Sequence, residues 1–423
     1  MFRSFDFDQF RRSVTKQPAG RSPGTCAAVR KQISNVRILV ANGLLLTLSL
    51  LLLGKGSLEF FKNTAGQDFR YRWSAEQYVL DRVDPFPLAF WTDEHKSMPP
   101  WMQTTVWSRI QDPVNVVDPP WVFAFGLFLF PSNRELAPYV FLLLNYVALG
   151  FLAMFICRLH DSQDPKIRVF LTSIFLANIA FSQQIINGNL GIFAVAASAG
   201  FFVLLRSNSG TWLGLPAALA QVKMTIGAPL GVILFACKKW RAAVLAVVVL
   251  MVAALWTCAM VRVSFPVLAG EMLEGVNRFS TGGTNFYKVF MLIGLQKKMA
   301  LVVCSTLILA ITMLISHKYS GDVHAQMAIF AVCARIVTYH NVIDNVVIGF
   351  LVIAAAHTWI ECEMSPGLGV LVGALVASLL IPGSIGNTAT VQASLQVFWV
   401  GSLAVVLRSR RRLPILAAQR LNP

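Results

Sequence analysis

The chain has 423 residues, of which 56% are hydrophobic and only 13% are charged. Soluble globular chains carry roughly 25% charged residues, so this composition excludes a disordered protein, a coiled coil and an ordinary cytosolic enzyme. It points instead to a polytopic membrane protein. The net charge of +16 comes largely from clusters beside apolar runs, where basic residues contact anionic membrane lipids and fix orientation. We therefore expect membrane lipids as partners, and no nucleic acid.

The N-terminal part of the chain, residues 1–36, is basic and reads as a disordered cytoplasmic tail. It precedes a first span that is retained rather than cleaved, because no small-residue cleavage site follows the apolar run. A helix needs about 20 apolar residues to cross a bilayer. Residues 37–408 contain twelve apolar runs that approach this length, and 409–423 form a second basic cytoplasmic tail. The runs are 37–54, 137–157, 167–184, 189–206, 210–222, 224–238, 240–262, 298–316, 325–339, 341–360, 366–382 and 389–408.

A thirteenth apolar stretch, 119–131, has proline at both ends. It is too short to cross, which favours a re-entrant or interfacial segment. The positive-inside rule supports this interpretation, because only then do the basic segments 158–168, 238–241 and 408–412 share one side with the N-terminus. The sequence thus predicts an all-α bundle of about twelve spans, with both termini cytoplasmic. Its long first outer loop, 55–118, is rich in acids, tryptophans and prolines and predicts interfacial helices.

The seven cysteines show no C-x-x-C spacing, and most lie in apolar runs. They read as small buried hydrophobes, so no disulfide framework, zinc site or other cofactor is expected. Nucleotide-binding fingerprints and a nucleophile elbow are also missing from the sequence. Any chemistry must therefore use a substrate that the membrane delivers.

The predicted topology collects several polar segments on the outer side. The first contains Asp68, a carboxylate close to the membrane surface that could act as a general base. Composition alone favours the alternative, a solvated loop acid paired with Arg70 or Arg72. The next segment, 182–189, offers amides that could bind sugar hydroxyls, or could simply form a polar turn.

Two further segments carry ionisable groups inside or beside apolar runs. Lys223 lies between two short runs, where it could bind a phosphate or snorkel to the surface. His340 and Asp344 are four residues apart and would share a helix face. Such a pair can orient a proton acceptor or bind a polar ligand, or form a hydrogen-bonded pair within the bundle. The spacing also suits a metal, but no third ligand is evident.

These motifs, in this order, resemble those of the polytopic GT-C glycosyltransferases, most closely glycosyltransferase family 87. The resemblance runs from Asp68 to about Ala356. It rests on the segments 68–71 and 84–86, on 118–121, where Asp118 stands for the usual tyrosine, on 184–189, on Lys223 with 238–241, and on 339–344. In the family a proline usually follows the lysine directly, whereas Met224 does so here.

The resemblance implies a sugar transferase that uses a polyprenyl-phosphate donor, mannose-like or other, on the outer face of a bacterial inner membrane. The acceptor would be linked to a lipid or a glycan, and no metal would be bound. Asp68 would be the catalytic base, with His340 as an alternative. Lys223 and Arg70 would hold the donor phosphate. The residues implied to position substrates are Tyr71, Gln184, Asn187, Asn189, His340 and Asp344.

Two other classes of protein compete with this interpretation. A transporter or lipid-linked sugar flippase would also have twelve spans and discontinuous helices, but the sequence shows no paired half-repeats. A polymerase or ligase of lipid-linked glycans would need an arginine-rich outer loop late in the chain, and the late outer loops hold little beyond His340 and Asp344.

Overall fold

A computed structural model describes residues 23–62, 66–82, 84–85, 118–126, 131, 133, 135–160, 163–279, 287–337, 342–382, 385 and 388–421. Within these ranges every regular element is a helix, which confirms the all-α prediction. Much of the long loop, 86–117, lies outside the described residues, as does His340.

The helices follow the predicted apolar runs closely. The first half of the chain contains α2 (Pro23–Lys62), α3 (Gln67–Leu80), α6 (Trp121–Gly126), α7 (Ala137–Leu159), α8 (Pro165–Leu176), α9 (Ile179–Asn187), α10 (Gly191–Arg206), η2 (Gly210–Leu213), α11 (Gly214–Leu219) and η3 (Ala220–Lys223). The second half contains α12 (Met224–Ala236), α13 (Trp240–Val261), α14 (Phe265–Phe279), α15 (Tyr287–Leu292), α16 (Lys297–Lys318), α17 (Val323–Ile336), η4 (Val342–Ile348), α18 (Gly349–Glu361), α19 (Pro366–Leu379) and α21 (Ala389–Leu421).

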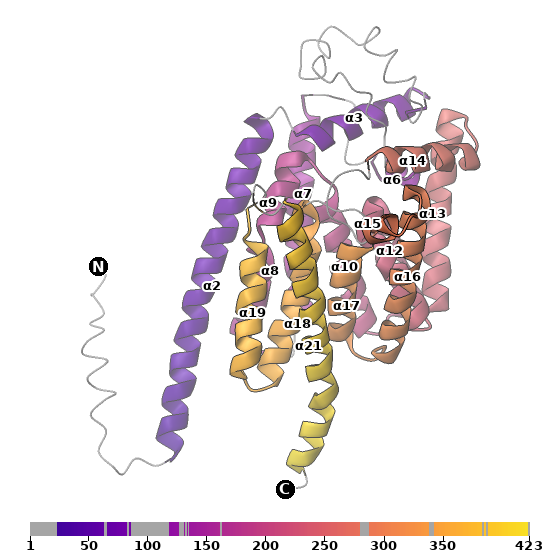
Figure 1. The fold of residues 1–423 in the computed structure, drawn as a ribbon. Helices are drawn as coiled ribbons and strands as arrows, with labels where there is room; N and C mark the ends of the chain where they lie inside the picture. The colour runs from indigo at the N-terminus through magenta and orange to yellow at the C-terminus, as the bar shows by residue number, and fades with distance from the viewer. Residues whose placement is uncertain are drawn as a thin grey trace.

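Within the described ranges, seven helical runs are long and apolar enough to cross a membrane, or eight if the bent pair α8–α9 counts as one span, so the predicted number of twelve spans is not confirmed. The chain is therefore a polytopic membrane protein. In Figure 1 most helices run roughly parallel, and α3 lies across one end of the bundle. We call this the α3 end. The opposite end, where α2 begins and α21 finishes, is the terminus end.

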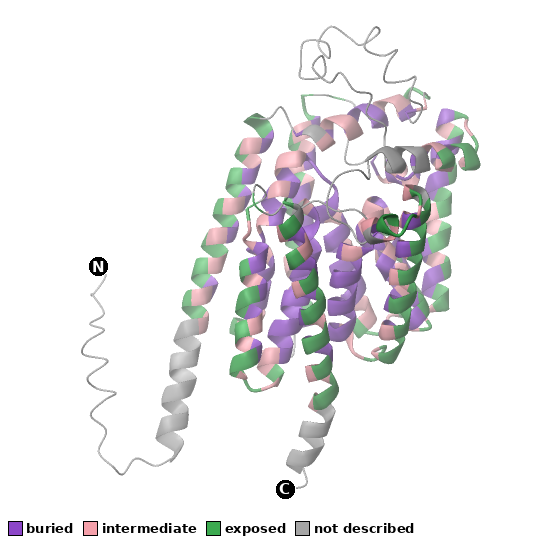
Figure 2. Ribbon diagram, in the orientation of Figure 1, coloured by how far each residue is buried: buried purple, intermediate pink, exposed green. Residues whose placement is uncertain are grey.

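The buried fraction of the side chains distinguishes the helices on the outside of the bundle from those at its centre (Figure 2). The outer helix α2 exposes Leu44 and Leu50 at 67% and 71% of their surface, as expected for side chains that face lipid. The centre is formed by α17 and α18, whose described side chains are nearly all buried. Phe202, Phe330 and Phe350 pack edge to face or tilted there, with ring centroids 5.4–5.5 Å apart.

The bend between α8 and α9 is 47°. It falls at Asn178, whose Oδ1 caps α9 by accepting from the Ala180 amide, while its Nδ2 donates to the carbonyl of Asn345. The side chain thus compensates for the interrupted backbone ladder on both sides. The bend aims the end of α9 at the α3 end of the molecule.

The run Gly210–Ala236 passes the length test for a span, yet it doubles back on itself. Its backbone breaks at Lys223, where φ is −129° and ψ is 91°. A straight helix of this length would separate its ends by about 40 Å, but Lys239 Nζ contacts Asn208 Oδ1. The run is therefore a helical hairpin, with Lys223 at its tip and both arms starting at the terminus end.

Several helices around this tip are short. Helices α10, α12 and α17 have 16, 13 and 14 residues, which corresponds to about 20–24 Å of length. The hydrocarbon core of a bilayer is about 30 Å thick. Each of the three is therefore shorter than the hydrocarbon core, whereas α2 has 40 residues. Helices α3 and α6 lie over these short helices in the fold (Figure 1).

Three boundaries differ from the sequence-based expectation. Helix α2 begins at Pro23 and continues to Lys62, so part of the tail predicted to be disordered, and the first residues of the loop 55–118, are helical. Helix α21 likewise continues through the basic tail to Leu421. Extending an existing helix needs no new nucleation, so helices run on past the apolar run that begins them. The described part of 119–131 contains α6, whose six residues are far too few to cross.

Candidate functional site

The first turn of α3 packs directly on the junction between α9 and α10. Phe69 lies among aromatic rings of α2 and α7, 5.7 Å from Phe60 and 5.0 Å from Phe141 between ring centroids. Gly188 sits beneath it with a left-handed φ of 68°, and a Cβ there would fall 2.2 Å from the Cβ of Phe69. Only glycine combines this conformation with so close an approach. These contacts fix where the neighbouring Asp68 projects.

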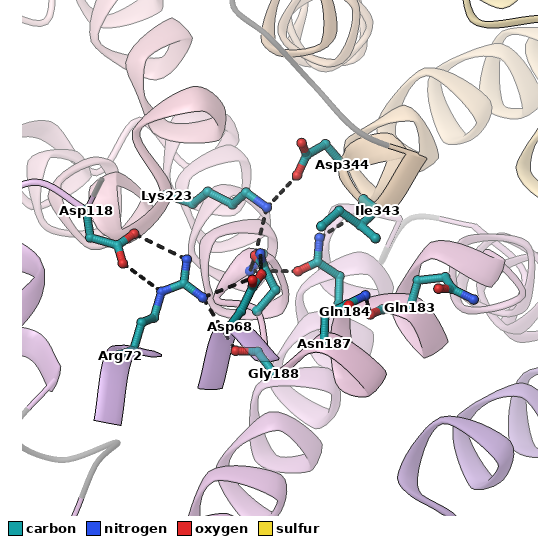
Figure 3. A network of polar contacts seen from close by, with 12 residues as sticks. Asp68, Arg72, Asp118, Gln183, Gln184, Asn187, Gly188, Lys223, Ile343 and Asp344 are labelled. Carbon is teal, nitrogen blue, oxygen red and sulfur yellow. Dashed lines mark hydrogen bonds and ion pairs between the residues drawn. The ribbon is translucent and has the colours of Figure 1, made fainter. Parts of the chain in front are cut away.

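Asp68 is held by two groups from different elements. Asn189 Nδ2 donates to its Oδ2 at 2.6 Å, and Arg72 Nη1 lies 3.8 Å from the same oxygen. The side chain of Asp68 is 34% exposed, against 14% for Arg72. Asp68 is therefore the most accessible carboxylate of the cluster and has both a cation and an amide donor beside it (Figure 3).

Asn189 connects Asp68 to the tip of the hairpin. Its Oδ1 accepts from Lys223 Nζ at 2.7 Å, while its Nδ2 serves Asp68. Because one amide supplies both contacts, its oxygen and nitrogen positions are defined by the charges on either side. The lysine ammonium and the Asp68 carboxylate are thus separated by a single amide group.

Lys223 also forms an ion pair with Asp344 in η4, and both side chains are largely buried. A buried lysine is costly unless a carboxylate or an anion compensates its charge. The tip that carries it is anchored from above, because Trp121 Nε1 donates to the carbonyl of Gln221 at 3.0 Å. Helix α6 is held in turn by the Thr257 hydroxyl, which donates to the Pro120 carbonyl at 2.7 Å.

At the other side of the network, Arg72 forms a two-pronged ion pair with Asp118. Nε lies 2.8 Å from Oδ2 and Nη2 3.3 Å from Oδ1, a geometry that fixes the orientation of the guanidinium. Arg72 Nη1 also reaches the carbonyl of Gly188 at 3.5 Å. The full chain of contacts runs Asp118, Arg72, Asp68, Asn189, Lys223, Asp344 (Figure 3).

Gln184 is buried and links backbone rather than charges. Its Nε2 donates to the carbonyl of Ile343 at 2.6 Å, and its Oε1 accepts from the amide of Gly191 at 3.1 Å. It therefore ties η4, which carries Asp344, to the start of α10. Asn187 Nδ2 donates to the Gln183 carbonyl of its own helix at 2.8 Å.

The structure brings together four of the residues singled out from the sequence: Asp68, Asn189, Lys223 and Asp344. Arg70 and Tyr71 lie half-buried on α3. Two residues along a helix are rotated by about 200°, so Arg70 leaves α3 on the side opposite Asp68. Arg72, four residues after Asp68, occupies the place expected for Arg70, and Asp118 joins it. His340 lies outside the described residues.

A second carboxyl of α3, Glu76, is 1% exposed, and its Oε1 has no hydrogen-bond partner among the residues described. Burial raises the pKa of Glu76 from 4.5 to about 8. This carboxyl is therefore protonated at neutral pH, unlike an ion-paired carboxylate. Burying this carboxyl without a partner for its Oε1 costs free energy within the helix that carries Asp68.

No family profile matches this chain, and neither a curated protein nor a solved structure shows significant similarity to it. The class of the protein thus rests on its own helices and on the polar network among them. It is an all-helical membrane protein in which a cluster of charged side chains is gathered where α3, the hairpin tip and η4 meet.

Proposed function

We propose that the chain is a membrane glycosyltransferase that moves a sugar from a polyprenyl-phosphate donor to an acceptor hydroxyl. The observation that carries the proposal is the placement of an accessible carboxylate, Asp68, one amide away from a buried ammonium, Lys223. A transfer of this kind needs a base for the acceptor proton and a cation for the leaving phosphate, on the two sides of one sugar.

In the proposed reaction the acceptor oxygen attacks the anomeric carbon while Asp68 removes its proton. The bond from the anomeric carbon to the phosphate oxygen breaks, polyprenyl phosphate leaves with the electron pair, and the anomeric configuration inverts. Lys223 uses two of its three N–H groups on Asn189 and Asp344 within the described structure, which leaves one for a phosphate oxygen. Arg72, in place of Arg70, adds positive charge next to Asp68.

The depth of the site suits a donor carried by lipid. Lys223 lies at the ends of helices that are shorter than the bilayer core, and a polyprenyl phosphate presents its charged group at the membrane surface. The terminus end carries basic side chains after several helices, including Arg158, Arg206, Lys239 and Arg410. By the positive-inside rule this end faces the cytoplasm, and the site then opens to the outer side.

A second function, a transporter or flippase for a lipid-linked sugar, is favoured by one observation. The hairpin 210–236 and the bent pair α8–α9 are discontinuous helices that meet at the charged cluster. Transporters build substrate sites from such broken helices. In that function Lys223 would bind the phosphate, but no proton would be removed by Asp68.

The deciding experiment incubates the purified full-length protein with a panel of radiolabelled polyprenyl-phosphate sugars and lipid acceptors, and measures labelled product. Asp68→Asn is expected to lower transfer by roughly 10²–10⁴-fold, because general bases contribute about that much. Asp81→Asn is the matched control. Asp81 is exposed and terminates the same helix, so the substitution should leave the rate unchanged.

The same preparations in proteoliposomes separate the two functions. Flipping of a lipid-linked sugar without transfer, equal in wild type and Asp68→Asn, would favour the transporter. Full transfer by Asp68→Asn would remove that carboxylate from the mechanism. Lys223→Gln should weaken donor binding in either function, with exposed Lys62→Gln as its control.

A further inference from the structure

Three histidines meet at the terminus end of the bundle, far from the network just described. His160 caps the end of α7, His324 lies in the first turn of α17, and His357 lies near the end of α18. All three are buried, and one ring nitrogen from each lies within 4.8 Å of the others. The rings of His324 and His357 are stacked with centroids 3.7 Å apart, and His160 lies 5.0 Å from His357.

The cluster contains ring nitrogens that the described protein does not satisfy. Neither Nδ1 nor Nε2 of His160 has a hydrogen-bond partner among the described residues, and the same is true of His324 Nε2. A buried polar nitrogen without a partner costs roughly 1–3 kcal/mol. Three buried imidazoles from three helices therefore form an arrangement that the folded chain does not by itself explain.

His357 lies beside a carboxylate, as metal-binding histidines often do, although its Nδ1 makes no hydrogen bond among the described residues. Its Nδ1 lies 3.2 Å from Glu361 Oε2, one helical turn further along α18. A carboxylate on one ring nitrogen fixes the tautomer and directs the other nitrogen outward as a ligand. In that pairing Nε2 is the nitrogen of His357 that remains for a ligand.

We propose that His160, His324 and His357 bind one divalent transition-metal ion, of the class that includes zinc. Imidazole nitrogens bind zinc at about 2.0–2.1 Å, which places three such ligands about 3.3 Å apart. The present spacing of up to 4.8 Å closes to this value with small side-chain rotations that also unstack His324 from His357. A water molecule supplies the fourth ligand.

The charges around the cluster permit a cation there. Arg410 approaches from α21, but it is held by Asp322, which it contacts through Nε, and by Glu361, 2.8 Å from its Nη1. Arg206 is turned to the end of α7, where Nη1 donates to the carbonyls of Arg158 and Leu159. Two carboxylates thus lie beside the three imidazoles, and a bound ion would join α7, α17 and α18 and, through Glu361, α21.

The test measures metal in the full-length protein, produced without a polyhistidine tag. The protein is incubated with zinc chloride, passed through a desalting column and analysed for zinc by mass spectrometry. We expect about one zinc ion per wild-type chain, and little in His324→Ala or His357→Ala. His317→Ala is the matched control. His317 lies at the same end but contacts the Ala236 carbonyl, so its loss should leave the zinc content unchanged.

A second measurement uses only the wild-type chain, in case a variant fails to fold. Cobalt(II) added to the metal-free protein should give the intense visible absorption of a four-coordinate site, and zinc should displace it. Thermal unfolding should shift upward with added zinc. Absence of both signals, or equal zinc content in wild type and the two variants, would overturn the proposal. Neither readout depends on sugar transfer, so the two proposals stand or fall separately.

Discussion

The two ends of the bundle hold buried polar clusters of opposite kinds. At the α3 end, carboxylates alternate with cations and an amide, and most contacts are short hydrogen bonds, the exception being the 3.8 Å ion pair of Arg72 with Asp68. At the terminus end, three imidazoles face one another with nitrogens that lack protein partners in the described chain. A satisfied network is already organised and stabilises its own geometry. A cluster that the described residues leave unsatisfied is where a bound ion would add most, as proposed above.

The largest effect is expected when the cation at the hairpin tip, Lys223, is removed from the satisfied network. Lys223→Met removes the ammonium from its ion pair with Asp344, and breaking a buried pair costs about 3–5 kcal/mol. We expect a clear fall in the midpoint of thermal unfolding in detergent, measured by tryptophan fluorescence. The double variant Lys223→Met, Asp344→Asn should recover part of the loss. Lys62→Met is the control, since its pair with Glu59 is exposed and such pairs contribute at most about 1 kcal/mol.

Glu76 is the exception at the α3 end, because it is buried and its pKa is raised to about 8. The pKa of Glu76 is higher in the folded state than in the unfolded state, where it is 4.5. Protonation of Glu76 therefore stabilises the folded state fully below pH 4.5, and this stabilisation is lost as the pH rises to about 8. Each pKa unit corresponds to about 1.4 kcal/mol. Glu76→Gln should therefore stabilise the protein at pH 8 and little at pH 4.5. A difference in unfolding midpoint that does not grow with pH would contradict this.

A smaller effect is expected where α3 meets the α9–α10 junction. Gly188→Ala places a Cβ against Phe69 and forces a left-handed conformation, which costs about 1–2 kcal/mol before any shift of α3. Asp68 is the residue next to Phe69, so a shift of this turn would also move the carboxylate, and sugar transfer should fall as well. Gly54→Ala is the matched control in α2, with no heavy atom within 4 Å, and should be neutral or slightly stabilising. Equal unfolding midpoints in the two variants would show that α3 is not anchored there.

The smallest effect concerns the terminus end in metal-free protein. His324→Leu replaces an imidazole whose Nε2 is unsatisfied in the described structure by an apolar group, which can be nearly neutral. We expect an unfolding midpoint close to that of the wild type in the presence of a chelator. Zinc should then raise the midpoint of the wild type only. A large loss in chelator would mean that the three rings stabilise the bundle without a metal.

The sequence predicted the helical class and placed Asp68, Asn189, Lys223 and Asp344 at one end, because topology follows from apolar runs and charge. It named Arg72 only as one of two arginines that could pair with Asp68 and gave it no part in the site, although a residue four positions after an acid on a helix is its natural partner. Arg70 entered as a phosphate-binding residue through the family resemblance, without a prediction of where a helix begins near Asp68. Helix geometry alone would have selected Arg72 rather than Arg70 as the cation beside Asp68.

The histidine cluster was missed for another reason. His160, His324 and His357 lie far apart in the sequence and form no spacing motif. Each, however, lies at or near the terminus end of a predicted span. The predicted topology therefore already placed all three histidines at the same side of the membrane, and this could have indicated the cluster. Their lateral proximity depends on the packing of α17 with α18 and on α8, which contacts both α7 and α18, and apolar periodicity does not specify this packing.

The hairpin 210–236 has a consequence for how this chain can change over time. Its tip is reached by two arms that both start from the terminus end, so the height of Lys223 is set by the number of residues in each arm. One inserted residue in either arm would raise the lysine by about 1.5 Å and turn it by about 100°. Hydropathy would hardly register such an insertion, yet it would detach the ammonium from Asn189. Substitutions along the arms should thus be tolerated far more readily than insertions or deletions, which makes arm length the quantity under selection.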